Sequence, residues 1–112
     1  MRVPSLVRFG DEKLKEAYDQ LPSGAGCDIE LKQLLDRAFI DLRDNAFCGI
    51  QIKKKLIPKE YIKKYGKLDN LWKYNLPNAW RLIYTIKRDI VFVLSVVLEW
   101  MNHKEYENRF KY

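Results

Sequence analysis

Residues 71–100 constrain the fold of this chain more than any other stretch, because three β-like blocks follow one another with a turn signal at each junction. The blocks are Leu71 to Leu76, Trp80 to Lys87 and Ile90 to Trp100. Pro77-Asn78-Ala79 separates the first two blocks, and Arg88-Asp89 separates the last two. Short polar or proline-containing breaks between β-branched and aromatic runs are typical of hairpins. The stretch therefore predicts a three-stranded antiparallel meander.

Two amphipathic helices are predicted ahead of this meander. Asp11 is placed to cap a first helix, and a glycine-bearing loop from Pro22 to Gly26 ends it. Asp28 then precedes a second helix, whose apolar residues recur with a period near 3.6: Ile29, Leu31, Leu34, Leu35, Ala38, Phe39 and Leu42. A short loop between two such helices makes a helical hairpin on one face of the sheet the expected arrangement.

The remaining segments complete the predicted order of elements. Ser5 to Phe9 is a short β-like piece, and Ile50 to Ile57 predicts the first strand of the main sheet. Pro58 to Tyr65 predicts a short helix that stops at Gly66, and the charged tail from His103 predicts another. The expected fold is α+β, with a helical hairpin packed on a small, mainly antiparallel four-stranded sheet and a short C-terminal helix.

Length and composition favour one domain over residues 1–112, because 112 residues that are 47% hydrophobic suit a single modest core. The apolar run from Ile90 to Leu98 is about half of the roughly 20 residues that a membrane-spanning helix needs. No signal peptide is predicted, and two cysteines without a CxxC spacing favour a reducing compartment. We therefore expect a cytoplasmic protein that does not engage a membrane.

Positive charge is concentrated in residues 53–73 of a chain whose formal net charge is +6. Aromatic side chains are interleaved with the lysines of this region. Cationic surfaces contact phosphates, and aromatic rings stack on unpaired bases, so the region favours RNA. An ordinary solvated surface would carry similar lysines, and this alternative stays open. The candidate RNA-binding residues are Lys53, Lys54, Lys55, Lys63, Lys64 and Trp72.

Four sequence features between Gly66 and Tyr106 follow one another in the order of a known protein family. They are Leu-Trp-Lys-Tyr-Asn-Leu before a turn, Trp-Arg-Leu-Ile-Tyr, Ile-Val-Phe-Val-Leu-Ser-Val, and a polar stretch that ends in Tyr106. In this order the segment resembles the C-terminal half of the RelE/ParE superfamily, the toxins of type II toxin–antitoxin systems. The predicted helix pair also fits the family, so the resemblance covers most of the chain.

The resemblance implies a RelE-like microbial RNase fold and a toxin that acts as a metal-independent endoribonuclease without a cofactor. Such toxins cleave mRNA, typically in the ribosomal A site, and thereby inhibit translation. A cognate antitoxin protein silences them in a toxin–antitoxin hetero-oligomer. Cleavage by the 2′-hydroxyl needs a base, an acid, and cations that stabilise the dianionic transition state.

Five residues are the catalytic candidates. By the resemblance, Arg81 matches a strand arginine that clamps the phosphate, and Lys73 matches a lysine of the preceding strand. Tyr106 takes the place of the family's C-terminal active-site tyrosine, which contacts the substrate. His103 is the only histidine and suits acid or base chemistry near neutral pH. Glu99 is a candidate base, or a residue that orients His103 or Arg81.

Each of these readings has an alternative that involves no catalysis. His103 in that case is a surface residue that caps the tail helix, and Glu99 is an exposed carboxylate at the end of a strand. At the level of the whole protein, the alternative is a non-catalytic RelE/ParE-fold protein. Such a protein would be either a ParE-like gyrase poison or a degenerate member that binds RNA or protein.

Overall fold

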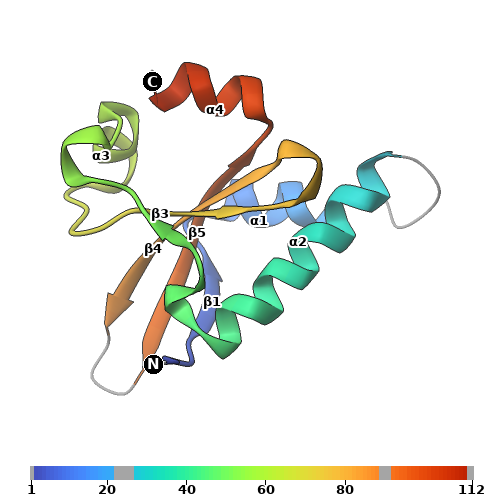
Figure 1. The fold of residues 1–112 in the computed structure, drawn as a ribbon, viewed down its shortest axis with the longest axis horizontal. Helices are drawn as coiled ribbons and strands as arrows, with labels where there is room; N and C mark the ends of the chain where they lie inside the picture. Colours follow the sequence, from blue (N-terminus) through green and yellow to red (C-terminus); the bar gives the residue numbers. More distant parts are fainter. Residues whose placement is uncertain (1, 22–26, 89–91, 111–112) are drawn as a thin grey trace.

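The computed structural model describes residues 2–21, 27–88 and 92–110. Within these ranges, a five-stranded sheet has helices packed on both of its faces (Figure 1). The strands are β1 (Leu6–Phe9), β2 (Ile50–Gln51), β3 (Trp72–Asn75), β4 (Arg81–Arg88) and β5 (Val93–Met101). The helices are α1 (Glu12–Asp19), α2 (Cys27–Asp44), α3 (Lys59–Tyr65) and α4 (His103–Phe110), with short 3₁₀ turns η1 (Ala46–Cys48), η2 (Lys54–Leu56) and η3 (Pro77–Ala79).

The strand order is β1-β5-β4-β3-β2, and the predicted meander forms its antiparallel centre. The α+β class is confirmed, but the prediction of four strands is wrong. The N-terminal strand also joins the sheet, because β1 pairs in parallel with β5 from Leu6 opposite Leu94 to Phe9 opposite Val97. The first and last strands of the chain are therefore neighbours.

The predicted strand from Ile50 to Ile57 is wrong beyond Gln51. Ile52 still donates its N–H to the carbonyl of Leu71 at 2.8 Å, but its side chain turns into the core, where it is 5% exposed. The chain then winds into η2 and reaches Pro58, which precedes α3 and cannot donate a ladder hydrogen bond. The predicted stop at Gly66 is confirmed, since this residue has a φ of 79° at the end of α3.

The first core layer lies between the sheet and α2, and it confirms the predicted apolar stripe. Leu35, Ala38 and Leu42 are fully buried there against β4 and β5. Asp11 caps α1 as predicted, by accepting the N–H of Leu14 at 2.7 Å. The helix α1 joins this layer through ring contacts of Tyr18 with residues of β1 and α2.

The opposite face of the sheet carries a second core layer beneath α3 and α4. Tyr61 of α3 and Tyr106 of α4 are both 3% exposed, and both belong to a buried cluster that includes Ile83 of β4. The sequence placed the helical hairpin on one face of the sheet and assigned no face to the two shorter helices, which cover the other face. β4 is buried on both sides, since Leu82 and Tyr84 face α2 while Ile83 faces α3 and α4.

Some predicted features lie outside the described residues. They are the loop from Pro22 to Gly26, the turn residue Asp89 and the start of the last strand at Ile90. The side chains of Asp28 and Ile29, a predicted cap and a predicted core residue, also lie outside the description. No helix in the described part of the chain is both long and apolar enough to span a membrane.

Candidate active site

Lys73 and Arg81 lie on one face of the sheet at the end where β3 and β4 are joined. Lys73 is opposite Ile83, and Asn75 is opposite Arg81, so the period of two in each strand directs both cationic side chains to the α4 side. Arg81 is also opposite Met101, the last residue of β5. The helix α4 starts two residues later and crosses this end of the sheet (Figure 1).

The Tyr106 ring contacts both of these cations. The Lys73 Nζ is 5.1 Å from the ring centroid, and the Arg81 Cζ is 5.6 Å from it. Tyr106 also packs on Phe110 with 4.6 Å between the ring centroids, and only 3% of Tyr106 is exposed. The buried Tyr106 ring is therefore a shared cation–π partner of Lys73 and Arg81, and such a contact contributes about 0.5–2 kcal/mol.

His103 lies between Arg81 and Glu107. The Arg81 Nη2 is 3.5 Å from His103 Nδ1, and the His103 Nε2 is 2.5 Å from Glu107 Oε1. A guanidinium can only donate, so an imidazole that accepts from Arg81 at Nδ1 carries its hydrogen on Nε2, where it donates to the Glu107 carboxylate. In that tautomer, Nδ1 is the acceptor that faces Arg81.

The Arg81 guanidinium has hydrogen-bond capacity beyond its contact with His103. Its Nη1 donates to the carbonyl of Trp80 at 3.2 Å, while its buried Nε has no hydrogen-bond partner in the described part of the chain. The described residues also include no carboxylate paired with Arg81. An arginine whose charge is not neutralised by a neighbouring acid is suited to binding an anion.

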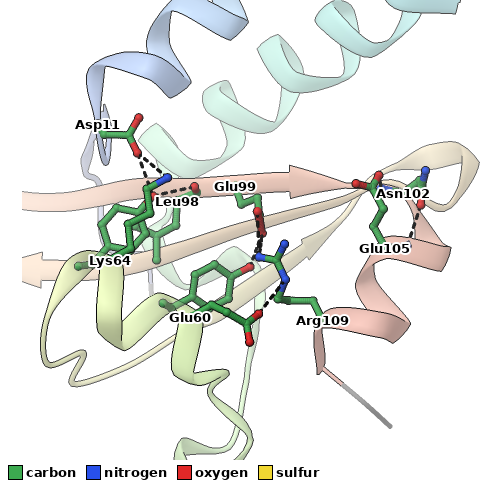
Figure 2. Close-up of polar contacts among 10 residues, drawn as sticks. Asp11, Glu60, Lys64, Leu98, Glu99, Asn102, Glu105 and Arg109 are labelled. Atoms are coloured by element: carbon green, nitrogen blue, oxygen red, sulfur yellow. Dashed lines mark hydrogen bonds and ion pairs between the residues drawn. The ribbon is translucent and has the colours of Figure 1, made fainter.

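Glu99 does not join this group, although it was a catalytic candidate. Its Oε1 accepts a hydrogen bond from the Tyr61 hydroxyl at 2.7 Å, and its two oxygens accept from Arg109 Nη1 at 2.7 and 3.0 Å. Arg109 also pairs with Glu60 at 3.1 Å, so these four side chains join α3, β5 and α4 (Figure 2). The Glu99 carboxylate is thereby committed to holding α4 in place.

The pKa values in this second group have clear physical causes. Burial, and then the hydrogen bond to Glu99, raise the pKa of Tyr61 far above its ordinary value. Burial alone would lower the pKa of Arg109, but the Glu99 and Glu60 carboxylates outweigh this effect and raise it. Tyr61 and Arg109 therefore keep their protons at any pH where the fold is stable, and the group acts as a fixed clamp. We call Glu60, Tyr61, Glu99 and Arg109 the clamp.

Asn102 and Glu105 set the direction in which α4 leaves β5. The Glu105 N–H donates to Asn102 Oδ1 at 2.8 Å, and the Asn102 N–H donates to Glu105 Oε1 at 3.3 Å (Figure 2). This reciprocal pair is a capping box, and it places His103 in the first turn of α4. Sequence reasoning missed this signal, although the Asn-x-x-Glu spacing at the start of the predicted tail helix could have revealed it.

The candidate RNA-binding residues do not form one surface. Lys53, Lys54 and Lys55 are exposed at η2, and Lys63 is exposed on α3. The following Lys64 forms an ion pair with Asp11 at 3.0 Å. The hydrogen bond from the Leu14 N–H, and then the Lys64 ammonium, lower the pKa of Asp11.

Trp72 lies on the α2 side of the sheet, away from Lys73, because neighbouring residues of a strand face opposite ways. It contacts the rings of Phe47 and Tyr84. Lys73, Arg81, His103 and Tyr106 are thus the candidates that the structure brings together, and we call them the cationic cluster.

Comparison with known proteins finds no match, either among family models, among curated sequences or among solved structures. Within the described ranges, no group of three or more His, Cys, Asp or Glu residues has a geometry that could hold a metal ion. The site must therefore be interpreted from its own chemistry.

Proposed function

We propose that this protein is an endoribonuclease that cleaves mRNA at the cationic cluster, as the toxin component of a RelE-like type II toxin–antitoxin system. One observation carries the proposal: Arg81 contacts the Nδ1 of the only histidine, while Lys73 lies against the same aromatic ring as Arg81. This combination supplies two cations for a phosphate and one group for proton transfer. The proposal is also supported by the resemblance of the segment from Gly66 to Tyr106 to the RelE/ParE superfamily.

The chemistry follows from the donors and acceptors of the cluster. A substrate phosphate competes with His103 for the Arg81 guanidinium, because an anion is a stronger acceptor than a neutral imidazole. When Arg81 turns to the phosphate, the Nδ1 lone pair of His103 is free to take the proton of the adjacent 2′-hydroxyl. The 2′-oxygen then forms a bond to phosphorus while the bond to the 5′-oxygen breaks. Water or the imidazolium returns a proton to that leaving oxygen.

The cations act on the charge that develops during this step. Arg81 and Lys73 face the pentacoordinate phosphorane, whose additional negative charge they stabilise more strongly than that of the ground-state phosphate. Tyr106 contributes a cation–π contact to each of the two cations. The proposed reaction uses side chains of this chain and needs neither a metal nor a cofactor.

The biological setting belongs to the same proposal. The mRNA is held by the ribosome in the cytoplasm during cleavage, and translation stops as a result. A cognate antitoxin protein binds the toxin in a hetero-oligomer and silences it. The region of exposed lysines at η2 and α3 supplies further positive charge for this large polyanionic partner.

A non-catalytic RNA-binding protein of the same fold is the second candidate, and a specific observation favours it. Tyr106 is buried and Glu99 is bound in the clamp, so His103 alone supplies acid–base chemistry among the five catalytic candidates. A protein with this cluster but without a second proton-transfer group could bind a phosphate and leave it intact.

Purified protein distinguishes the two candidates. We expect the wild type to cut a defined mRNA when translating ribosomes are present and to arrest growth when its synthesis is induced. His103→Ala and Arg81→Ala should abolish both effects, whereas Arg37→Ala, which removes an exposed arginine of α2, should not. Binding of RNA without cleavage, with or without ribosomes, would establish the second candidate. Inhibition of gyrase would instead favour a ParE-like poison.

A further inference from the structure

A hollow lies at the opposite end of β4 from Arg81. It has a volume of about 770 Å³ and is lined by residues of η1, the loop before β3, and β4. The hollow exists because β4 is longer than the neighbouring strand β3. The pairing with β3 ends at Tyr84 opposite Trp72, while β4 continues to Arg88. We call this hollow the notch. Its volume falls within the range of about 300–1,000 Å³ that is typical of small-ligand sites.

The floor of the notch is the edge of β4 that continues beyond the end of β3. The Asn70 side chain covers this edge at Ile86, since its Nδ2 donates to the carbonyl of Ile86 at 2.9 Å and its Oδ1 accepts the Ile86 N–H at 2.8 Å. The alternation of a strand directs the N–H and C=O of Arg88 to the same side of β4 as those of Ile86. A peptide N–H and C=O on one strand edge are a donor and an acceptor of the kind that the hydrogen-bonding edge of a nucleobase matches.

The walls of the notch combine aromatic rings with positive charge. Phe47, which is 38% exposed, meets Trp72 with 5.4 Å between the ring centroids. Three exposed cationic side chains line the notch against a single carboxylate, that of Asp69; the cations are Lys67, Lys87 and Arg88. This charge balance favours an anionic ligand over an apolar peptide, and the aromatic wall favours one that carries a flat ring.

We infer that the notch binds one unpaired nucleotide of single-stranded RNA, with its base against Phe47 and its phosphates on Lys67, Lys87 and Arg88. This inference rests on the proposed function for the identity of the ligand. Arg81 and Ile86 are separated along β4 by about 17 Å, at about 3.3 Å per residue. The notch therefore provides a subsite remote from the cleaved phosphate, and it holds the substrate at a second point.

Binding of an uncleavable probe tests this inference separately from catalysis. The probe is a short fluorescent 2′-O-methyl oligouridylate, which has no 2′-hydroxyl for the reaction, and its partner is an abasic oligomer of the same length. The double variant Lys87→Ala/Arg88→Ala should lower the affinity for both probes by at least about tenfold at low salt. The matched control Lys13→Ala/Arg37→Ala, which removes two exposed cations from α1 and α2, should bind as the wild type does.

Phe47→Ala isolates the contribution of the base. We expect this variant to have an at least about fivefold lower affinity for the oligouridylate, which is the lower end of the effect of losing one base–aromatic stack. The abasic oligomer should bind equally well to Phe47→Ala and to the wild type. Circular dichroism melting confirms that each variant is folded.

The outcomes separate the notch from the cationic cluster. If the wild type cleaves mRNA but the notch variants bind both probes as the wild type does, the inference fails and the proposed function stands. If the notch variants lose the probe while no cleavage is seen, the notch is an RNA site and the proposed catalysis fails. Equal losses in the matched control, or notch variants that lose only a protein antitoxin, would overturn the inference.

Discussion

Arg81 of β4 and Arg109 of α4 both contact side chains at the interface between α4 and the sheet. They differ in whether carboxylates neutralise their charge. Arg109 meets the carboxylates of Glu99 and Glu60, so its charge is neutralised within the clamp. Arg81 instead contacts the imidazole of His103 and the face of the Tyr106 ring. The presence or absence of a neighbouring carboxylate therefore separates the two roles. Arg109 has a structural role, and the charge of Arg81 is available to an external anion.

The largest effect that would break this comparison is expected at His103. His103→Ala should lower the rate of mRNA cleavage by about 10²–10⁴-fold, the usual range for loss of a general acid or base. Initial cleavage rates check this, with Lys104→Ala as the neighbouring control. A variant that keeps the wild-type rate would exclude His103 from proton transfer.

Arg81→Ala is expected to have the next largest effect. Loss of the guanidinium that binds the substrate phosphate should lower the cleavage rate by about 10²–10³-fold. Arg81→Lys should recover little of it, because an ammonium lacks the bidentate fork. The free energy of unfolding should fall by no more than about 2 kcal/mol, the upper value for the cation–π contact with Tyr106, since Arg81 has no ion-pair partner in the described part of the chain. A large loss of stability with normal cleavage would mean that Arg81 resembles Arg109 after all.

Glu99→Gln sharpens the contrast from the side of the clamp. The substitution keeps the shape but removes the charge that Arg109 and Tyr61 contact, so it should lower the free energy of unfolding by about 1–2 kcal/mol. Cleavage by the folded variant should fall less than tenfold. Urea unfolding and initial rates measure the two quantities. A loss of activity as large as that of His103→Ala, at unchanged stability, would restore Glu99 as a catalytic base.

The smallest effect is expected at the capping box. Asn102→Ala should cost about 1 kcal/mol of stability through the lost cap, and it should loosen the first turn of α4 that carries His103. Asn108→Ala, an exposed position further along the same helix, is the matched control. Amide hydrogen exchange in α4 should rise in the first variant and not in the second. Unchanged exchange in both would show that the clamp alone orients the helix.

The sequence predicted the meander and the α2 stripe because each depends on a local period. The turn at Pro77 and the spacing of Leu35, Ala38 and Leu42 are visible within a few residues of chain. The parallel pairing of β1 with β5 has no such local signal, so the sheet was predicted one strand too small. The length of β2 was overestimated, because the alternating pattern continues past Gln51 in the sequence whereas the chain turns inward at Ile52 in the structure.

The candidate site divides in the same way. Lys73 and Arg81 could be placed on one face from strand register alone, and His103 and Tyr106 from their position after the last strand. The role of Glu99 could not, because its partners Tyr61 and Arg109 come from two other helices and meet it only in the folded protein. Long-range ion pairs of this kind leave no spacing in a sequence.

The neighbouring positions of β1 and β5 have a consequence during protein synthesis. β1 leaves the ribosome well before β5, the strand with which it pairs. The nascent chain therefore carries β1 without this partner until β5 emerges, and long-range pairing of this kind slows folding. Because α4 follows β5, His103 also reaches Arg81 only after β5 has been made.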